Sequence, residues 1–243
     1  MPRRVATIGV LVLATFSLAA AWGRKPPKEE EVKVTLRALT PSEVMTILHK
    51  FPEMVPSDMA SKANDTSYLT SVFDFSEVTA APLERDFPAV RFYKCLNTES
   101  PFARSPYLIA VVGNRRSTLP GGYGQLLYDC GLKATERNMI ELARVFVLLA
   151  AGFHTVYLDD ERGREVDGIT FFPPVAFMDA QRVSKTLDGT TFDAMLKVRV
   201  GKKVEEWYFQ RRHDQFAAVE RRAYAGQLIK QYDLLGAEPP PKR

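Results

Sequence analysis

The feature that most restricts the fold is a helix-forming segment at residues 136–151, near the middle of the chain. Thr135 suits the N-cap position before it, and Gly152 suits its end. The first half of the segment is amphipathic, but residues 145–151 (Val-Phe-Val-Leu-Leu-Ala-Ala) are apolar on every side. Helices of that kind lie buried in the middle of a domain, and this one is too short for a membrane span. We therefore expect it at the centre of the protein.

The last third of the chain has the pattern of an antiparallel sheet. Apolar residues alternate with polar ones over residues 192–200, which indicates a half-buried strand. Tight turns at residues 201–202 and 213–214 let the chain return twice, which gives further strands at 204–212 and 216–224. These segments predict a sheet built from consecutive hairpins.

A helix start is encoded at residues 40–43. The sequence Thr-Pro-Ser-Glu combines a capping box with proline in the first turn, so a helix should begin there and end near Pro52. Residues 53–88 contain several turn-forming residues. We expect them to form mostly loop, with short helical turns.

Two strands are expected next, at residues 90–95 and 107–112, and the second is apolar enough to lie inside a sheet. A glycine-rich loop is expected at 113–124, followed by another strand near residues 126–128. All these elements together predict the α+β class. The expected plan is an N-terminal helix, one buried central helix and a mainly antiparallel sheet built from C-terminal hairpins.

The length and composition fit one globular domain. The chain has 243 residues, of which 46% are hydrophobic and 26% charged, which excludes collagen, low-complexity disorder and a coiled-coil rod. Residues 22–36 mix prolines with charges and predict a linker, and residues 236–243 form a proline-rich tail. The domain itself is expected at residues 37–235, with a subdivision near residue 88 left open.

Residues 1–21 predict export. Arg3 and Arg4 precede an uncharged run from Val5 to Trp22 that ends in small residues, which is the pattern of a secretory signal peptide. Cleavage would release a nearly neutral periplasmic or secreted protein. The alternative is an uncleaved N-terminal segment that tethers the protein to a membrane, because the run is close to the length that spans a bilayer.

The two cysteines, Cys95 and Cys130, predict a structural disulfide in an oxidising compartment. On the loop-entropy model such a bond would stabilise the fold by about 4 kcal/mol. The alternative is two separate buried thiols that behave as small apolar residues. A redox-active pair is disfavoured, because the spacing is unlike Cys-x-x-Cys.

Candidate catalytic groups are few. Ser117 lies in the glycine-rich loop, and His154 precedes a run of carboxylates that ends at Glu161. A histidine beside carboxylates can serve in acid–base chemistry, but a charged turn also explains this run. The sequence contains no HExxH, CxxC or Gly-x-Ser-x-Gly motif and indicates neither a metal site nor a cofactor. The catalytic candidates are Ser117, His154, Asp159 and Asp160.

Candidate binding residues are mostly basic. Residues 197–230 hold nine Lys and Arg against four acids, with aromatic residues among them. Such a mixture can bind an anionic polymer, an envelope surface or an envelope protein, although on a strand the aromatic rings normally enter the core. The net charge of +4 is too modest to indicate specific nucleic-acid binding. The binding candidates are Arg115, Arg116, Lys197, Arg199 and Trp207.

The sequence therefore predicts an exported, soluble, non-catalytic protein that binds a ligand or belongs to a cell-envelope assembly. This prediction depends on the export signal and on the lack of a recognisable catalytic constellation. The alternative is an extracytoplasmic hydrolase with a site between the 113–124 loop and the region of His154 and Asp159–Glu161. The residues identify no ligand for either.

Overall fold

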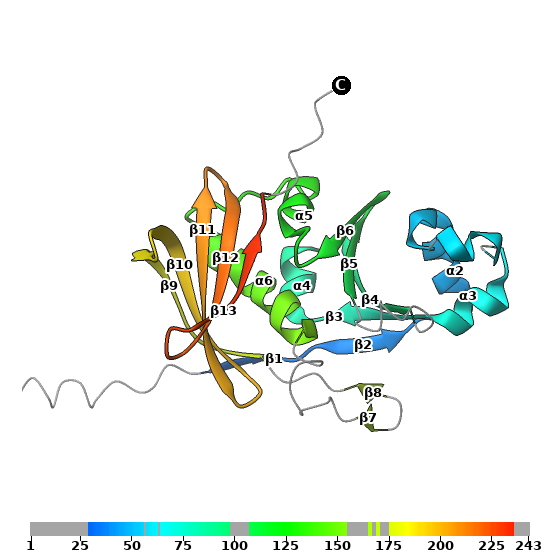
Figure 1. The fold of residues 1–243 in the computed structure, drawn as a ribbon, viewed down its shortest axis with the longest axis horizontal. Helices are drawn as coiled ribbons and strands as arrows, with labels where there is room; N and C mark the ends of the chain where they lie inside the picture. The colour runs from blue at the N-terminus through cyan, green and yellow to red at the C-terminus, as the bar shows by residue number, and fades with distance from the viewer. Residues whose placement is uncertain are drawn as a thin grey trace, which may run out of the picture.

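The computed structural model describes residues 29–55, 57–62, 64–97, 107–154, 165–166, 169–170 and 175–235. These residues form two antiparallel sheets with helices between them and helices on the outer face of one sheet (Figure 1). The prediction of an α+β protein with a strand-rich body is confirmed. The sequence indicated one main sheet, whereas the structure has two of similar size.

The first sheet, sheet A, contains the predicted C-terminal hairpins. Each strand pairs antiparallel with its neighbours, and the tight turns after residues 200 and 212 lie where the sequence placed them. The strands that flank the predicted hairpins in this sheet, at residues 30–32, 175–187 and 228–233, were not predicted. In spatial order the strands are β1 (Glu30–Val32), β9 (Val175–Leu187), β10 (Thr190–Val200), β11 (Lys203–Arg212), β12 (Gln215–Ala223) and β13 (Leu228–Asp233).

The second sheet, sheet B, comes from the first half of the chain. Its strands also pair antiparallel, and two of them are the strands predicted from residue 90 onward. In spatial order they are β2 (Thr35–Ala38), β3 (Phe73–Thr79), β4 (Val90–Asn97), β5 (Tyr107–Val112) and β6 (Arg115–Leu119). A separate small pair consists of β7 (Glu165–Val166) and β8 (Ile169–Thr170).

The helices begin and end at recognisable residues. The capping box of the first helix is present, because the N–H of Thr40 donates to Glu43 Oε2 at 2.8 Å and the N–H of Glu43 donates to Thr40 Oγ1 at 3.4 Å. The helical segments are α2 (Pro41–Lys50), the 3₁₀ turns η1 (Pro52–Met54) and η2 (Ser57–Lys62), α3 (Thr66–Val72), α4 (Ala81–Asp86), α5 (Tyr123–Asp129) and α6 (Met139–His154).

Helix α6 lies between the two sheets (Figure 1). Every side chain from Val145 to Ala151 is at most 1% exposed, because α6 has apolar neighbours on all sides. The ring of Phe146 packs edge-on against the rings of Trp207 and Phe209 in sheet A. Residues of α6 and of both sheets belong to one hydrophobic cluster, so α6 joins the two sheets into a single core. Full burial of a side chain such as Phe146 stabilises the folded state by about 2 kcal/mol.

A second core lies on the other face of sheet B, under α2 and α3. Strand alternation places Phe75, Cys95 and Ile109 on this face, in one buried cluster with Leu48 of α2 and Leu69 of α3. Neighbouring positions such as Phe92 point the other way, toward α6. Sheet B is therefore covered on both faces.

Two expected features of residues 113–128 are wrong. The loop expected at 113–124 contains strand β6, which pairs with β5, and the strand expected at 126–128 belongs to helix α5. Leu126 and Leu127 are both buried. Adjacent side chains of a strand point to opposite faces, whereas both can meet the same core from a helix. The two consecutive leucines therefore fit a helix packed between two sheets.

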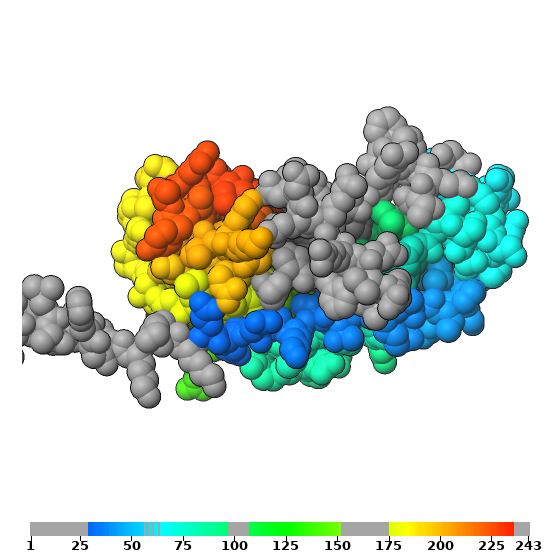
Figure 2. Space-filling model, turned by 90° about the horizontal axis from the view of Figure 1, so that it is seen from below, coloured from blue at the N-terminus to red at the C-terminus, as the bar shows by residue number. Residues whose placement is uncertain are grey.

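Parts of two other segments also differ from expectation. Residues 30–32 and 35–38 fall in strands, although 22–36 was expected to be a linker. Strand β3 occupies residues 73–79, where loop was expected. Figure 2 shows the blue N-terminal strands crossing from sheet A to the cyan helices beside sheet B. Within the described ranges, no helix is long and apolar enough to cross a membrane.

Candidate functional site

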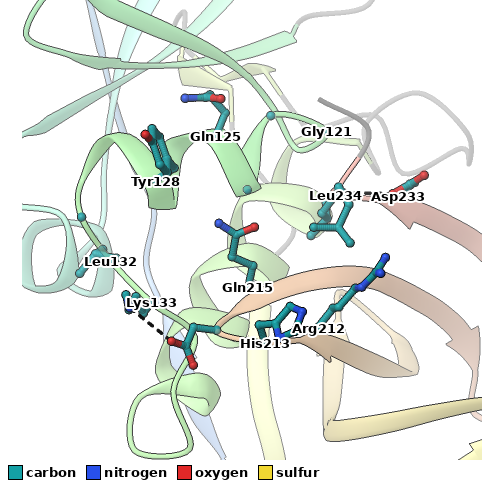
Figure 3. A pocket seen from close by; sticks show the side chains of 15 residues that line it. Gly121, Gln125, Tyr128, Leu132, Lys133, Arg212, His213, Gln215, Asp233 and Leu234 are labelled. Carbon is teal, nitrogen blue, oxygen red and sulfur yellow. Dashed lines mark hydrogen bonds and ion pairs between the residues drawn. The ribbon is translucent and has the colours of Figure 1, made fainter. Parts of the chain in front are cut away.

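An open groove of about 1080 Å³ lies beside helix α5 (Figure 3). One wall is α5 with the loop that follows it, at residues 131–133. The opposite wall is the turn between β11 and β12, and the end of β13 closes one side. Its polar side chains come from Gln125, Lys133, Arg212, His213, Asp214, Gln215 and Asp233. We call this cavity the α5 groove.

Two glycines let α5 sit close to its neighbours. A Cβ atom on Gly122 would lie 2.6 Å from the carbonyl oxygen of Thr118, and one on Gly124 would lie 2.6 Å from that of Leu234. The hydroxyl of Tyr123, between them, donates to the carbonyl oxygen of Leu142 in α6 at 2.8 Å. Backbone contacts and a buried hydrogen bond therefore fix this wall of the groove.

The opposite wall is tied to the first through residues 133 and 134. The N–H of Ala134 donates to the carbonyl oxygen of Asp214 at 2.7 Å, and Arg211 Nη1 donates to the carbonyl oxygen of Ala134 at 3.1 Å. Lys133 Nζ adds an ion pair to Asp214 Oδ2 at 3.4 Å. His213 has a φ of +55°, a left-handed conformation that is uncommon for residues other than glycine. These contacts hold the turn in a fixed position.

The carboxylates at the groove already have partners. Asp129, at the end of α5 and outside the groove lining, accepts hydrogen bonds from Arg115 Nη1 and from Gln125 Nε2 at 2.9 Å. Asp233 Oδ1 accepts from the N–H of Leu235 at 3.1 Å. Asp214 pairs with Lys133, as described above. Of the two carboxylates that line the groove, only Asp214 therefore has an ion-pair partner, whereas Asp233 accepts a single backbone N–H.

By contrast, three polar side chains on the turn wall are unpaired. The side chains of Arg212, His213 and Gln215 are exposed and make no hydrogen bond or ion pair with any described part of the chain. Figure 3 shows the side chain of Gln215 directed from β12 toward α5. Only the turn at residues 213–214 was recognisable in the sequence, and its role as a groove wall was missed because α5 was expected to be a strand.

The two arginines expected to bind an anion do not converge. Arg115 and Arg116 are adjacent on β6, so their side chains leave opposite faces of sheet B. Arg115 pairs with Asp129 of α5, whereas Arg116 Nη2 lies 3.1 Å from Glu53 Oε1 on the other side. Each arginine therefore has its own structural partner.

The residues expected for hydrolysis are not brought together in the described part of the structure. Ser117 lies within β6 and is 6% exposed. His154 is the last residue of α6, and its side chain falls outside the described part. Asp159, Asp160 and Glu161 lie outside the described residues altogether. Within those residues, no group of three or more His, Cys, Asp and Glu could hold a metal ion.

The remaining binding candidates lie in sheet A, apart from the groove. Trp207 is fully buried against α6, so its ring is in the core, as the alternative interpretation had it. Lys197 Nζ lies 4.1 Å from the ring centre of Tyr224. Arg199 pairs with Glu29 near β1. None of the three lines the α5 groove.

A buried ion pair next to Trp207 was missed by the sequence analysis. Arg221 Nε donates to Glu205 Oε2 at 2.8 Å, and the same carboxylate oxygen accepts from Trp207 Nε1 at 3.2 Å. Glu205 lies two residues before Trp207 on β11, so alternation alone places it on the buried face. This pair belongs to the core and not to the groove.

The predicted disulfide is wrong, because Cys95 and Cys130 are both free thiols. Cys95 lies under α2 and α3, on the outer face of sheet B, and its Sγ donates to Tyr107 Oη at 3.2 Å. Cys130 follows α5 and packs against the core on the other side of that sheet. Burial raises the pKa of Cys95 to about 12 and the pKa of Cys130 to about 11. The alternative of two separate thiols is therefore correct, with Cys95 buried and Cys130 half-buried.

Comparisons with known proteins do not identify a family. Neither the family models, nor the curated proteins, nor the solved structures include a match to this chain. The geometry of the α5 groove is therefore the main guide to function.

Proposed function

We propose that this chain is an exported, non-catalytic binding protein whose ligand occupies the α5 groove. The observation that carries the proposal is the groove itself, an open cavity of about 1080 Å³ with fixed walls and unpaired polar side chains. Ligand sites are concave, largely preformed and few per protein. A cavity of this size has room for a ligand well above the size of a single ion.

The chemistry of the lining supports binding in preference to covalent catalysis. None of the described residues that line the groove is a serine, threonine or cysteine, the usual nucleophiles of hydrolases. His213 could in principle act as a base, but it makes no hydrogen bond within the described chain that would orient it. Recognition needs only the fixed walls and the unpaired side chains.

The proposal includes export through the signal at residues 1–21. It also includes the plan of one domain with an N-terminal helix and a buried central helix, but the domain begins at residue 30 and not at the expected residue 37, because β1 and β2 belong to the two sheets. N-terminal sequencing of the protein after expression in its own host tests the first part. A mature chain that begins near residue 22 is expected, whereas an intact Met1 in a membrane fraction would favour the tethered alternative.

The proposal that the ligand binds in the groove is tested with a variant whose larger side chain fills the groove. We would screen peptides and small polar metabolites by thermal shift on the wild-type chain and on Gln215→Trp, which places an indole in the groove. The matched control is Gln231→Trp, an exposed glutamine of β13 that does not line the groove. Compounds that stabilise the wild type should also stabilise Gln231→Trp but lose their effect on Gln215→Trp. Equal responses of both variants would contradict the proposed site.

A further inference from the structure

The charges at the α5 groove are unequally satisfied. Of the two carboxylates that line it, Asp214 pairs with Lys133 and Asp233 accepts the backbone N–H of Leu235. The guanidinium of Arg212 has no partner among the described residues, although it lies on the same wall. The groove therefore offers a ligand one guanidinium without an ion-pair partner among the described residues, although the carboxylate of Asp233, which accepts only a backbone N–H, lines the same groove.

The geometry of the guanidinium limits what that ligand carries. Arginine presents a planar fork of N–H donors that matches a carboxylate in a bidentate arrangement. One unpaired arginine balances a single negative charge, which a carboxylate carries. A phosphate group carries more charge and is usually held by several cationic or N–H donors. The single positive charge of Arg212 therefore matches a carboxylate better than a phosphate.

The rest of the groove suits a peptide chain. Gln215 offers an unpaired side-chain amide, which both donates and accepts hydrogen bonds as a peptide group does. Apolar surface is also present, because the ring of Tyr128 is 48% exposed and Leu132 and Leu235 are partly exposed at the same cavity. Amide and apolar contacts together match an extended peptide with small apolar side chains.

We propose that the α5 groove binds a short peptide segment through a carboxylate held by Arg212, with Gln215 bound to the peptide backbone. The carboxylate belongs either to the C-terminus of the peptide or to an Asp or Glu side chain. This inference rests on the proposed function and specifies the ligand of the same groove.

The test uses defined pools of short peptides in matched forms. The four pools are degenerate tetrapeptides with a free C-terminal acid or a C-terminal amide, each with and without glutamate. Binding to the ¹⁵N-labelled chain is measured by titration of backbone amide shifts, including those of residues 212–215. Shifts should follow the pools that carry a carboxylate, and the two single-carboxylate pools distinguish a chain end from a side chain.

Two variants show whether Arg212 holds the carboxylate. Arg212→Gln should weaken binding of the carboxylate pools by about tenfold, the loss expected for one charge-assisted pair. The matched control is Arg137→Gln, because Arg137 is also exposed and unpaired among the described residues but does not line the groove. The control variant should bind as the wild type does.

Three outcomes would overturn the inference. The first is equal binding of acid and amide pools, and the second is equal affinity of wild type and Arg212→Gln. The third is a groove that shows no shift with any peptide pool. None of these contradicts the proposed binding function, which is judged separately by the Gln215→Trp screen with other compounds.

Discussion

Gly124 and Leu234 meet through their backbones, so that a Cβ atom on Gly124 would lie 2.6 Å from the carbonyl oxygen of Leu234. Leu234 cannot move away freely, because its N–H donates to the carbonyl oxygen of Ala217 at 3.0 Å and its side chain is buried. This contact joins helix α5 to the residue after β13. Two sides of the groove are therefore held at a fixed separation.

Substitution of Gly124 by alanine should destabilise the protein by about 1–3 kcal/mol, because a new methyl group would displace backbone atoms in a packed region. The matched control is Gly121→Ala, where a Cβ atom would meet nothing within 4 Å. That variant should be as stable as the wild type or slightly more so, since alanine restricts the unfolded chain. Urea denaturation of the three proteins gives the comparison, and equal loss in both variants would show that the contact is not rigid.

The buried pair of Glu205 and Arg221 should tolerate joint replacement better than single replacement. Arg221→Met alone leaves a buried carboxylate without its cation and should cost about 3 kcal/mol in the free energy of unfolding. The double variant Glu205→Leu/Arg221→Met removes both charges and should recover most of that loss. A double variant that is less stable than the single one would show that the ion pair itself stabilises the fold.

Glu77 should make stability depend on pH. Burial opposes its ionisation, but hydrogen bonds and charge from Arg37 and Arg91 outweigh burial and hold its pKa below the usual range. The ionised state is therefore favoured more in the folded than in the unfolded chain. This stabilisation is complete above the ordinary glutamate pKa and is lost as pH falls through the lower pKa of the folded state.

The measurement is the difference in unfolding free energy between wild type and Glu77→Gln. It should be about 1 kcal/mol at neutral pH, since the two arginine side chains are 51% and 67% exposed and water screens the pairs. The difference should shrink below about pH 4. A difference that stays constant down to pH 2 would contradict the role given to the carboxylate.

Both cysteines should be found as thiols. Protein that is denatured without reductant should take up two alkyl groups, whereas a disulfide would leave none. In the native protein at neutral pH, Cys95 should react far more slowly than Cys130, because it is fully buried and burial raises its pKa to about 12. Mass spectrometry of labelled peptides after timed alkylation gives both results, with a fully reduced sample as the reference.

The elements predicted correctly are those with local signals. The capping box at Thr40 and Glu43 defines the start of α2, and the alternation of residues 192–200 defines β10. Strand β3 was missed because it follows α3 directly at Phe73, with no turn residue to separate them. Strand β9 was missed because its apolar and polar residues do not alternate regularly. Its pairing with β10 also contains register shifts, which mark bulges.

The candidate site could not be predicted in the same way. The turn at His213 was visible in the sequence, but its position opposite Gln125 depends on long-range packing of α5 between two sheets. Arg212 and Arg137 both lack a partner in the described chain, and only the structure shows that Arg212 also lines the groove. Neither the position of this turn nor the surroundings of Arg212 can be inferred from the neighbouring residues in the sequence.

The strands β1 and β2 have a consequence for the order in which the protein can assemble. β2 pairs with β3 nearby in the chain, but Glu30–Val32 pair with residues 175–177, so β1 must wait for the second half of the polypeptide. Contacts between such distant residues form slowly. The first strand of the described chain to be synthesised would thus be among the last to be fixed, and sheet A cannot be completed before residue 177 has been made.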